Sequence, residues 1–263
     1  LYGIASSASQ VVAVGSLGTI ITSTDGNSWA TSASNVVVNL NGIATSGTKF
    51  AAVGDLGTIV TSSDLVTWTL QASGTTNRLR AIAWTGSQFI AVGDSGTILT
   101  SPDAATWTKQ TSGTTNDLYG VAGNNTQPQN VVVGAGDTIL TSPTGATWTP
   151  RTSQGGNMLH SVVWSGVQFL IAGDSINGTV QTSYDGITWT GHTTRWGNAM
   201  YGAAWSGAQF EIVGTAGITQ TSPDGISWTS PQNNSFVPDL NGVAWFKNQF
   251  IAVGMNGAIY LLP

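Results

Sequence analysis

Residues able to take part in chemistry are few in this chain, and many of them fall at one recurring position. The 263 residues include 12 acidic residues, 7 lysines and arginines, 2 histidines and no cysteine. A leucine or methionine recurs every 39 to 41 residues and is followed each time by a large polar or aromatic residue, namely Tyr2, Asn41, Arg80, Tyr119, His160, Tyr201 and Asn241. Such side chains suit hydrogen bonding and stacking, so we expect a binding site; a solvated strand end that tolerates any polar residue is the alternative.

A second candidate is the segment His192–Gly197, which contains Arg195 and Trp196. The corresponding segments elsewhere have the sequence SGTTN, at 73–77 and 112–116. A tryptophan beside arginine and histidine suits sugar stacking or a protein contact. Packing of Trp196 on a neighbouring loop is the alternative.

Catalytic constellations are missing from the sequence. Glycoside hydrolysis needs two carboxylates flanking the scissile bond, yet Glu211 is the single glutamate and the aspartates fall mostly in turns. Two histidines without cysteine supply neither a hydrolytic triad nor a metal site. We therefore expect a protein that is not an enzyme, with no catalytic residue, no metal and no cofactor.

The elements that position these residues repeat seven times. Segments such as AVGDSGTILTSPDAATW return from end to end, with anchoring glycines from Gly15 to Gly254. Each repeat resolves into four strands, for which Leu240–Trp245, Phe89–Val92, the GTIxTS stretch and Trp107–Lys109 are examples. Four-stranded units at a period near 40 are typical of propeller blades. The sequence predicts one all-β domain over residues 1–263, a seven-bladed β-propeller of antiparallel blades starting near 1, 40, 79, 118, 159, 200 and 240.

A turn of sequence SxDGxT/SW, best seen at Ser222–Trp228, closes the third strand of six repeats. A short carboxylate accepts backbone N–H groups within its turn, and the tryptophan ring is expected to bury between blades. The aspartates expected to be structural are Asp25, Asp64, Asp103, Asp185 and Asp224, with Thr144 in the fourth repeat. The tryptophans are Trp29, Trp68, Trp107, Trp148, Trp189 and Trp228.

These motifs resemble the Asp-box (bacterial neuraminidase) repeat, and the flanking strand signature is similar to that of the photosystem II stability/assembly-factor-like propellers. The resemblance covers the whole chain and implies the propeller fold, with the box as a structural turn away from the binding face. It implies little about function, because unrelated functions share the box. The arginine cluster and Tyr–Glu pair of a sialidase are missing, and so is the basic patch known in the photosynthetic members.

Three further expectations concern the arrangement of the blades. The turns between second and third strands and the loops between blades should share one rim, which would carry the ligand. Asp55, Asp94 and Asp174 are interpreted as turn-forming residues rather than ligand groups. Glu211 occupies a slot that holds Ile90 or Ile251 in other repeats, and it is either solvated or a buried acid.

The seventh repeat stops after its third strand. We expect a three-stranded last blade, or residues upstream of Leu1 that supply the fourth strand. The open edge is itself a candidate attachment point.

Composition sets the expected partners. A net charge of −5 with few cations disfavours nucleic acid, and no apolar run is long enough to span a bilayer. Low charge with many Ser and Thr residues suggests a secreted or cell-surface protein. We expect a lectin-like propeller that binds a glycan; a protein ligand is the second choice, and a scaffold subunit of a surface assembly is the third.

Overall fold

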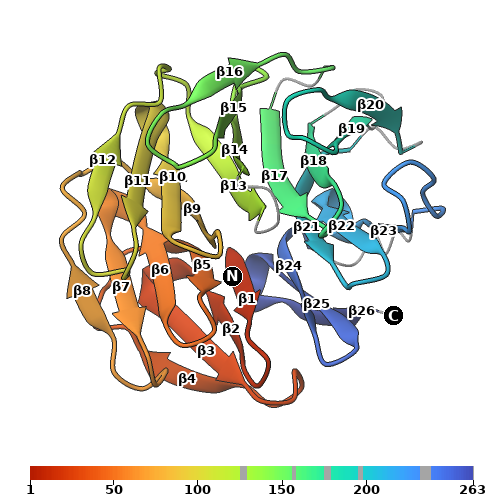
Figure 1. The fold of residues 1–263 in the computed structure, drawn as a ribbon. Helices are drawn as coiled ribbons and strands as arrows, with labels where there is room; N and C mark the ends of the chain where they lie inside the picture. The colour runs from red at the N-terminus through yellow and green to blue at the C-terminus, as the bar shows by residue number, and fades with distance from the viewer. Residues whose placement is uncertain (125–128, 156–157, 175–178, 195–197, 232–237, 263) are drawn as a thin grey trace.

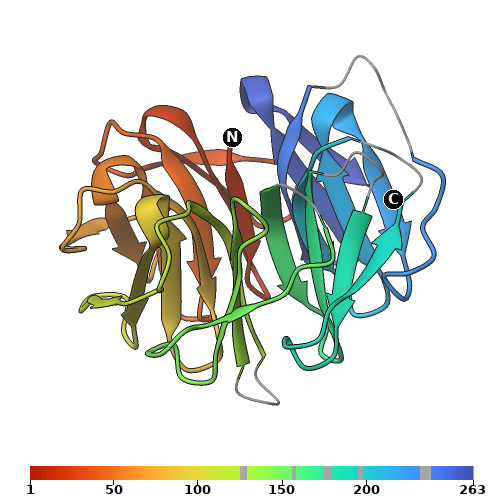
Figure 2. The ribbon, with the colours of Figure 1, turned by 90° about the horizontal axis from the view of Figure 1, so that it is seen from above.

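The computed structural model describes residues 1–124, 129–155, 158–174, 179–194, 198–231 and 238–262. The chain forms seven small antiparallel sheets that stand in a ring around a central channel (Figures 1 and 2). Each sheet begins with its innermost strand and continues outward strand by strand. The predicted all-β, seven-bladed propeller is confirmed. No helix among the described residues is long and apolar enough to cross a membrane.

The first four blades each have four strands. They are β1 (Gly3–Ser6), β2 (Val11–Val14), β3 (Thr19–Ser23) and β4 (Ala30–Ala33); β5 (Leu40–Thr45), β6 (Phe50–Gly54), β7 (Ile59–Ser62) and β8 (Thr69–Gln71); β9 (Leu79–Trp84), β10 (Phe89–Gly93), β11 (Thr97–Ser101) and β12 (Thr108–Gln110); β13 (Leu118–Asn124), β14 (Gln129–Gly134), β15 (Ile139–Ser142) and β16 (Thr149–Arg151). The outer strands start one residue later than predicted, because the tryptophan still belongs to the preceding turn.

The remaining blades are β17 (Met158–Trp164), β18 (Phe169–Asp174), β19 (Thr179–Ser183) and β20 (Thr190–Thr193); β21 (Met200–Trp205), β22 (Phe210–Gly214) and β23 (Thr219–Ser222); β24 (Leu240–Phe246), β25 (Gln249–Gly254) and β26 (Ile259–Leu262). The last blade is three-stranded, as expected. In the sixth blade the fourth position is taken by a segment after Trp228, which is held by a hydrogen bond from the Thr229 N–H to the Thr221 carbonyl (3.0 Å). Pro231 has no N–H to extend this pairing into a strand.

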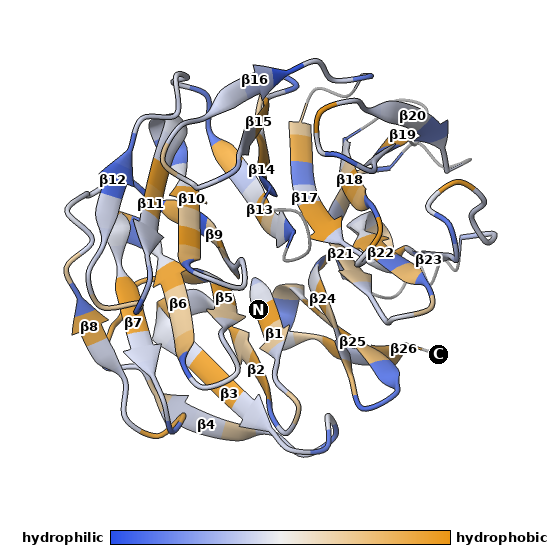
Figure 3. Cartoon of the chain, in the orientation of Figure 1, coloured by the Kyte–Doolittle hydropathy of each residue, from blue (hydrophilic) through white to orange (hydrophobic). Residues whose placement is uncertain are grey.

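The second strand of each blade is buried along its whole length. Every residue of Val11–Val14 is fully buried, and β6, β10 and β25 contain equally buried runs. A strand in this position has a neighbouring blade on each face, so both sets of side chains are apolar. Figure 3 shows the resulting concentration of hydrophobic residues on the inner strands, with polar residues toward the outer strands and turns.

Tryptophans of the turns after the third strands connect neighbouring blades. Trp68 packs against Val12 and Ile20 of the blade before it, and Trp29 packs in the same way against Ile251 of the seventh blade. Trp68, Trp148 and Trp189 are buried, and the other three rings are half-buried. Each ring therefore joins its own turn to the preceding sheet.

In these turns each aspartate accepts two backbone N–H groups. Asp103, for example, accepts the N–H groups of Ala105 and Thr106 at 2.8 Å, together with the hydroxyl of Ser101. Asp25, Asp64, Asp185 and Asp224 make the same set of bonds. Backbone hydrogen bonds, named first among the causes, lower the pKa of Asp25, Asp64 and Asp103 to about 2.

The rim that carries these turns, here called the lower rim, is closed by side chains from the preceding blade. Gln88 donates to the carbonyl of Thr144 (2.6 Å), and Gln168 donates to that of Asp224 (2.7 Å). The ring closes in the same way, since Lys247 of the seventh blade donates to the carbonyl of Thr24 in the first (2.7 Å). The opposite, upper rim carries the turns between second and third strands and the loops between blades. These contact one another, for example from Asp55 N–H to Asn39 carbonyl, as predicted.

Glu211 is a buried acid. It lies on the face of the sixth blade that packs against the seventh, because its cross-strand partner Ala204 and its neighbour Val213 both contact Leu240 and Phe250 there. Its side chain is 2% exposed, and its Oε1 has no hydrogen-bond partner. Desolvation raises the pKa of Glu211 to about 8.

We predict that Glu211 makes the protein less stable as pH rises. Between pH 4.5 and about 8 the unfolded carboxyl ionises while the folded one keeps its proton, so the free energy of unfolding should fall by ~1.4 kcal/mol per pH unit. Glu211→Gln should flatten this dependence, and Glu211→Leu should be the more stable protein at pH 8. Urea unfolding at pH 5 and pH 8 measures it; equal slopes for wild type and Glu211→Gln would contradict the assignment.

We also predict that Thr144→Asp stabilises the protein. Thr144 makes only a long contact with the Ala146 N–H (3.4 Å), whereas an aspartate there would accept two backbone N–H groups as Asp103 does. The expected gain in Tm is ~2–4 °C by thermal unfolding. Asp103→Thr is the matched control and should lower Tm by a similar amount; a Tm unchanged in both would show that the carboxylate is dispensable.

Candidate functional site

The recurring polar or aromatic residue of the innermost strands occupies a β-bulge in six of the seven blades. In the second blade Leu40 lies opposite Gly54 and Gly42 lies opposite Val53, so Asn41 has no partner on β6. The same shift leaves Arg80, Tyr119, His160, Tyr201 and Asn241 unpaired. In the first blade Tyr2 precedes β1, with its N–H bonded to the carbonyl of Val14. A bulge turns its residue out of the regular pleat.

All seven residues line one depression at the upper mouth of the channel. The depression has a volume of about 380 Å³ and is completed by Arg78 and Met158. The channel below it, about 230 Å³, is lined by small and aliphatic residues of the innermost strands. The residues singled out in each repeat are thus brought together. Arg195 and Trp196 lie outside the described residues.

Three of the mouth residues are held by an aspartate 14 residues further along the chain. Asn41 donates to Asp55 (3.0 Å), Arg80 pairs with Asp94, and His160 bonds Asp174 (2.9 Å). The aspartate follows the second strand, which runs antiparallel to the innermost one, so the two positions meet at the upper rim. Asp55, Asp94 and Asp174 therefore bond these side chains, and the interpretation of them as merely turn-forming residues is corrected.

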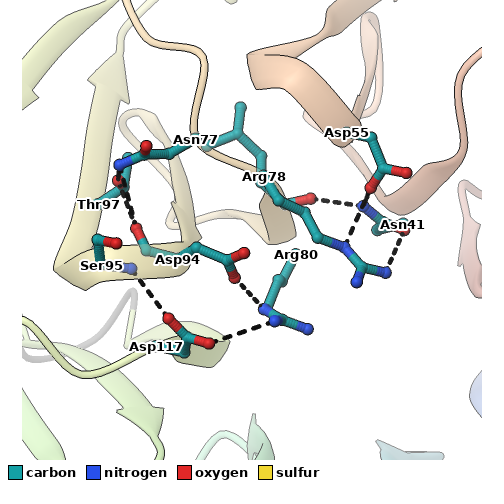
Figure 4. Close-up of polar contacts among 10 residues, drawn as sticks. Asn41, Asp55, Asn77, Arg78, Arg80, Asp94, Ser95, Thr97 and Asp117 are labelled. Atoms are coloured by element: carbon teal, nitrogen blue, oxygen red, sulfur yellow. Dashed lines mark hydrogen bonds and ion pairs between the residues drawn. The ribbon is translucent and has the colours of Figure 1, made fainter.

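Figure 4 shows the charged part of the mouth. Arg78 forms an ion pair with Asp55 (Nε to Oδ1, 3.0 Å) and donates to the side-chain oxygen of Asn41 (3.1 Å). Arg80 reaches from Asp94 to Asp117 of the next blade (3.3 Å). All four charged partners are partly exposed, so these pairs hold side chains in place more than they stabilise the fold.

Planar groups stack along the other part of the mouth. The guanidinium of Arg80 lies 4.9 Å from the ring centroid of Tyr119, which lies 5.5 Å from that of His160. His160 in turn meets the ring of Tyr201 edge to face at 5.2 Å. Four consecutive blades are linked by these contacts, so the side chains are fixed before any ligand arrives.

Two carboxylates act on the Tyr201 phenol. Burial is the main cause that raises the pKa of Tyr201, and the negative charges of Asp239 and Asp174 add to it, because ionisation would place a third negative charge beside them. Asp239 is held by the Ala216 N–H (2.8 Å). The mouth thus combines fixed hydrogen-bonding groups with partly exposed rings. Among the described residues, no three His, Asp or Glu side chains gather as a metal site requires.

Sequence reasoning missed Arg78, Asp117 and Asp239, which all precede an innermost strand. It also missed the pairing 14 residues apart, although the chain carries a signal for it. Asn41, Arg80 and His160 are each followed at that distance by aspartate, whereas Tyr2, Tyr119 and Tyr201 are followed by Ser16, Ala135 and Thr215, respectively.

No protein-family model matches this chain, and no curated protein matches its sequence. Solved structures do match its fold. A structure described as YCF48 bound to D1 peptide aligns with a TM-score of 0.73 at 18% identity, covering 97% of this chain and 87% of that one. YCF48 from Cyanidioschyzon merolae aligns at 0.76 and 14% identity, covering 100% and 94%. The WD40 propeller domain of Doa1 aligns at 0.82 and 10% identity, covering 98% and 91%. At these identities, the likeness establishes the fold alone.

We predict that Asp239→Asn lowers the pKa of Tyr201. The substitution removes one of the two negative charges that oppose ionisation of the phenol, while the amide oxygen can still accept the Ala216 N–H. NMR titration of ring-labelled tyrosine, assigned with Tyr201→Phe, measures the change. An unaltered titration would show that Asp239 lies too far from the phenol to affect it.

Proposed function

We propose that this protein is a non-enzymatic recognition propeller that binds a segment of a protein partner at the upper mouth of its channel. The observation that carries the proposal is the convergence of seven variable side chains from one repeated, bulged position into a single depression. Their neighbours in the innermost strands remain small or aliphatic in every blade. Side chains that vary within a constant frame are what a binding face requires.

Geometry favours binding over catalysis at this mouth. The carboxylates of Asp55, Asp94 and Asp174 are engaged by Arg, Asn or His side chains, and Asp117 and Asp239 accept backbone N–H groups. Groups fixed in this way position a ligand rather than exchange protons with it. The depression is open and faces away from the lower rim, so an extended chain can enter it.

A protein segment is favoured over a glycan because of the ring contacts. Sugar recognition by stacking uses the open face of an aromatic ring, yet Tyr119 has Arg80 and His160 as neighbours. The printed description of one structurally similar propeller, YCF48 bound to D1 peptide, is consistent with peptide binding by this architecture. Glycan binding through residues 195–196 and a scaffold role in a surface assembly remain the alternatives.

Two further parts of the proposal rest on sequence. The SxDGxT/SW turns support placing the chain among Asp-box propellers. Its acidic, lysine-poor and Ser/Thr-rich composition supports a secreted or cell-surface location and argues against nucleic acid as the partner.

The test is selection of ligands on the wild-type protein from a random peptide display library, with a glycan array in parallel. We expect enriched peptides whose Kd rises at least ~10-fold in Tyr201→Ala and Tyr2→Ala, because each substitution removes a ring from the mouth. Tyr184→Ala, which removes an exposed ring on the lower rim, is the matched control and should bind normally. Binding that survives both mouth variants, or reproducible binding to glycans alone, would reject the proposal.

A further inference from the structure

Two exposed leucines of the second blade stand where other repeats have small or polar residues. Leu56 lies in the turn after β6 and is 70% exposed; Leu70 lies on β8 and is 64% exposed. In the third blade the equivalent residues are Ser95 and Lys109. Exposed leucines contribute nothing to the core, so burial within this chain does not explain them.

Leu56 also has an unfavourable backbone conformation. Its φ is 56°, in the left-handed region that non-glycine residues rarely adopt. Ser95 and Asn256 have the same conformation at the equivalent position, and asparagine tolerates it better than leucine. The stability of the turn would therefore improve with another residue, and an unfavourable residue that is kept exposed points to a contact with something else.

Both leucines line one groove on the upper rim. The groove has a volume of about 670 Å³ and runs between the turn of Leu56, strand β8 and the loop 72–77, with threonine and serine side chains along it. The third blade has a similar groove of about 750 Å³ without the leucines. The repeat thus produces the hollow, and the leucines make one copy of it apolar.

This groove is continuous with the mouth. Asp55, which precedes Leu56, forms the ion pair with Arg78, and Arg78 lines the mouth depression. Asn77, which precedes Arg78, lines the groove. A chain leaving the mouth across the Arg78–Asp55 pair therefore enters the groove directly.

We propose that the groove is an extension of the binding site, and that it takes an aliphatic or aromatic side chain of the same partner segment between Leu56 and Leu70. The inference rests on the proposed function, and it names the partner class as an extended protein segment with an apolar residue beyond the part held at the mouth. Contact with that residue removes the leucine surface from water.

Peptides selected on the wild type from the random library serve as the probe, with Kd measured by fluorescence polarisation. We expect Leu56→Ser and Leu70→Thr each to raise Kd at least ~5-fold, and Leu17→Ser to leave it unchanged. Leu17 is the matched control, because it has the same left-handed conformation (φ 52°) and is 77% exposed but lies outside the groove. Replacing the apolar residue of the peptide by alanine should have an effect that does not add to that of Leu56→Ser.

Leu56→Asn separates docking from a structural role, since it should weaken binding while Tm stays equal or rises. Loss of Tm in this variant, or wild-type binding by Leu56→Ser and Leu70→Thr, would overturn the groove proposal. If at the same time Tyr201→Ala abolishes binding, the mouth proposal stands on its own. If the groove variants weaken binding and the mouth variants do not, the mouth proposal fails instead. Selection of no peptide at all would overturn both.

Discussion

The close approach of the seven innermost strands is the constraint on which the rest of the molecule depends. At Gly42 an added Cβ would lie 3.1 Å from the Ala81 Cα, and at Gly120 it would lie 2.9 Å from the carbonyl oxygen of His160. Only small residues fit at this position, so the ring is narrow and the channel has no room for large side chains. The residue before it therefore leaves the pleat through a bulge, and its side chain is directed to the channel mouth.

The two rims differ because of how they are connected. On the lower rim, tryptophan rings and side chains such as Gln88 and Gln168 tie each blade to the next, and the aspartates satisfy backbone donors within the turns. That rim spends its polar groups on the fold. On the upper rim the polar groups come from the bulges and the loops between blades, and several of them remain partly exposed around a depression. Binding is therefore assigned to the rim where the repeat allows variation.

Repetition made most of the architecture predictable. The number of blades, the order of their strands and the sharing of rims follow from a period of 39 to 41 residues and from glycine-rich turns. The bulge was not predictable, because an extra residue in one strand leaves no mark in a hydrophobic pattern that repeats identically. For Glu211, one polar residue in an apolar slot signals an exception but not its burial, which depends on Ala204 and Phe250 from other strands. The fourth position of the sixth blade failed as a strand because of Pro231.

The pairing of residues 14 apart has a consequence for how such a surface diversifies. Asn41 with Asp55, Arg80 with Asp94, and His160 with Asp174 each lie within a single blade, and each pair is joined by the same antiparallel crossing. A donor and its aspartate can thus be exchanged together as a cassette, with little disturbance to the backbone. The mouth is in this sense a dial of seven sockets with one shared mounting. Duplication of a blade copies the mounting, and two substitutions then suffice to give the new socket a chemistry of its own.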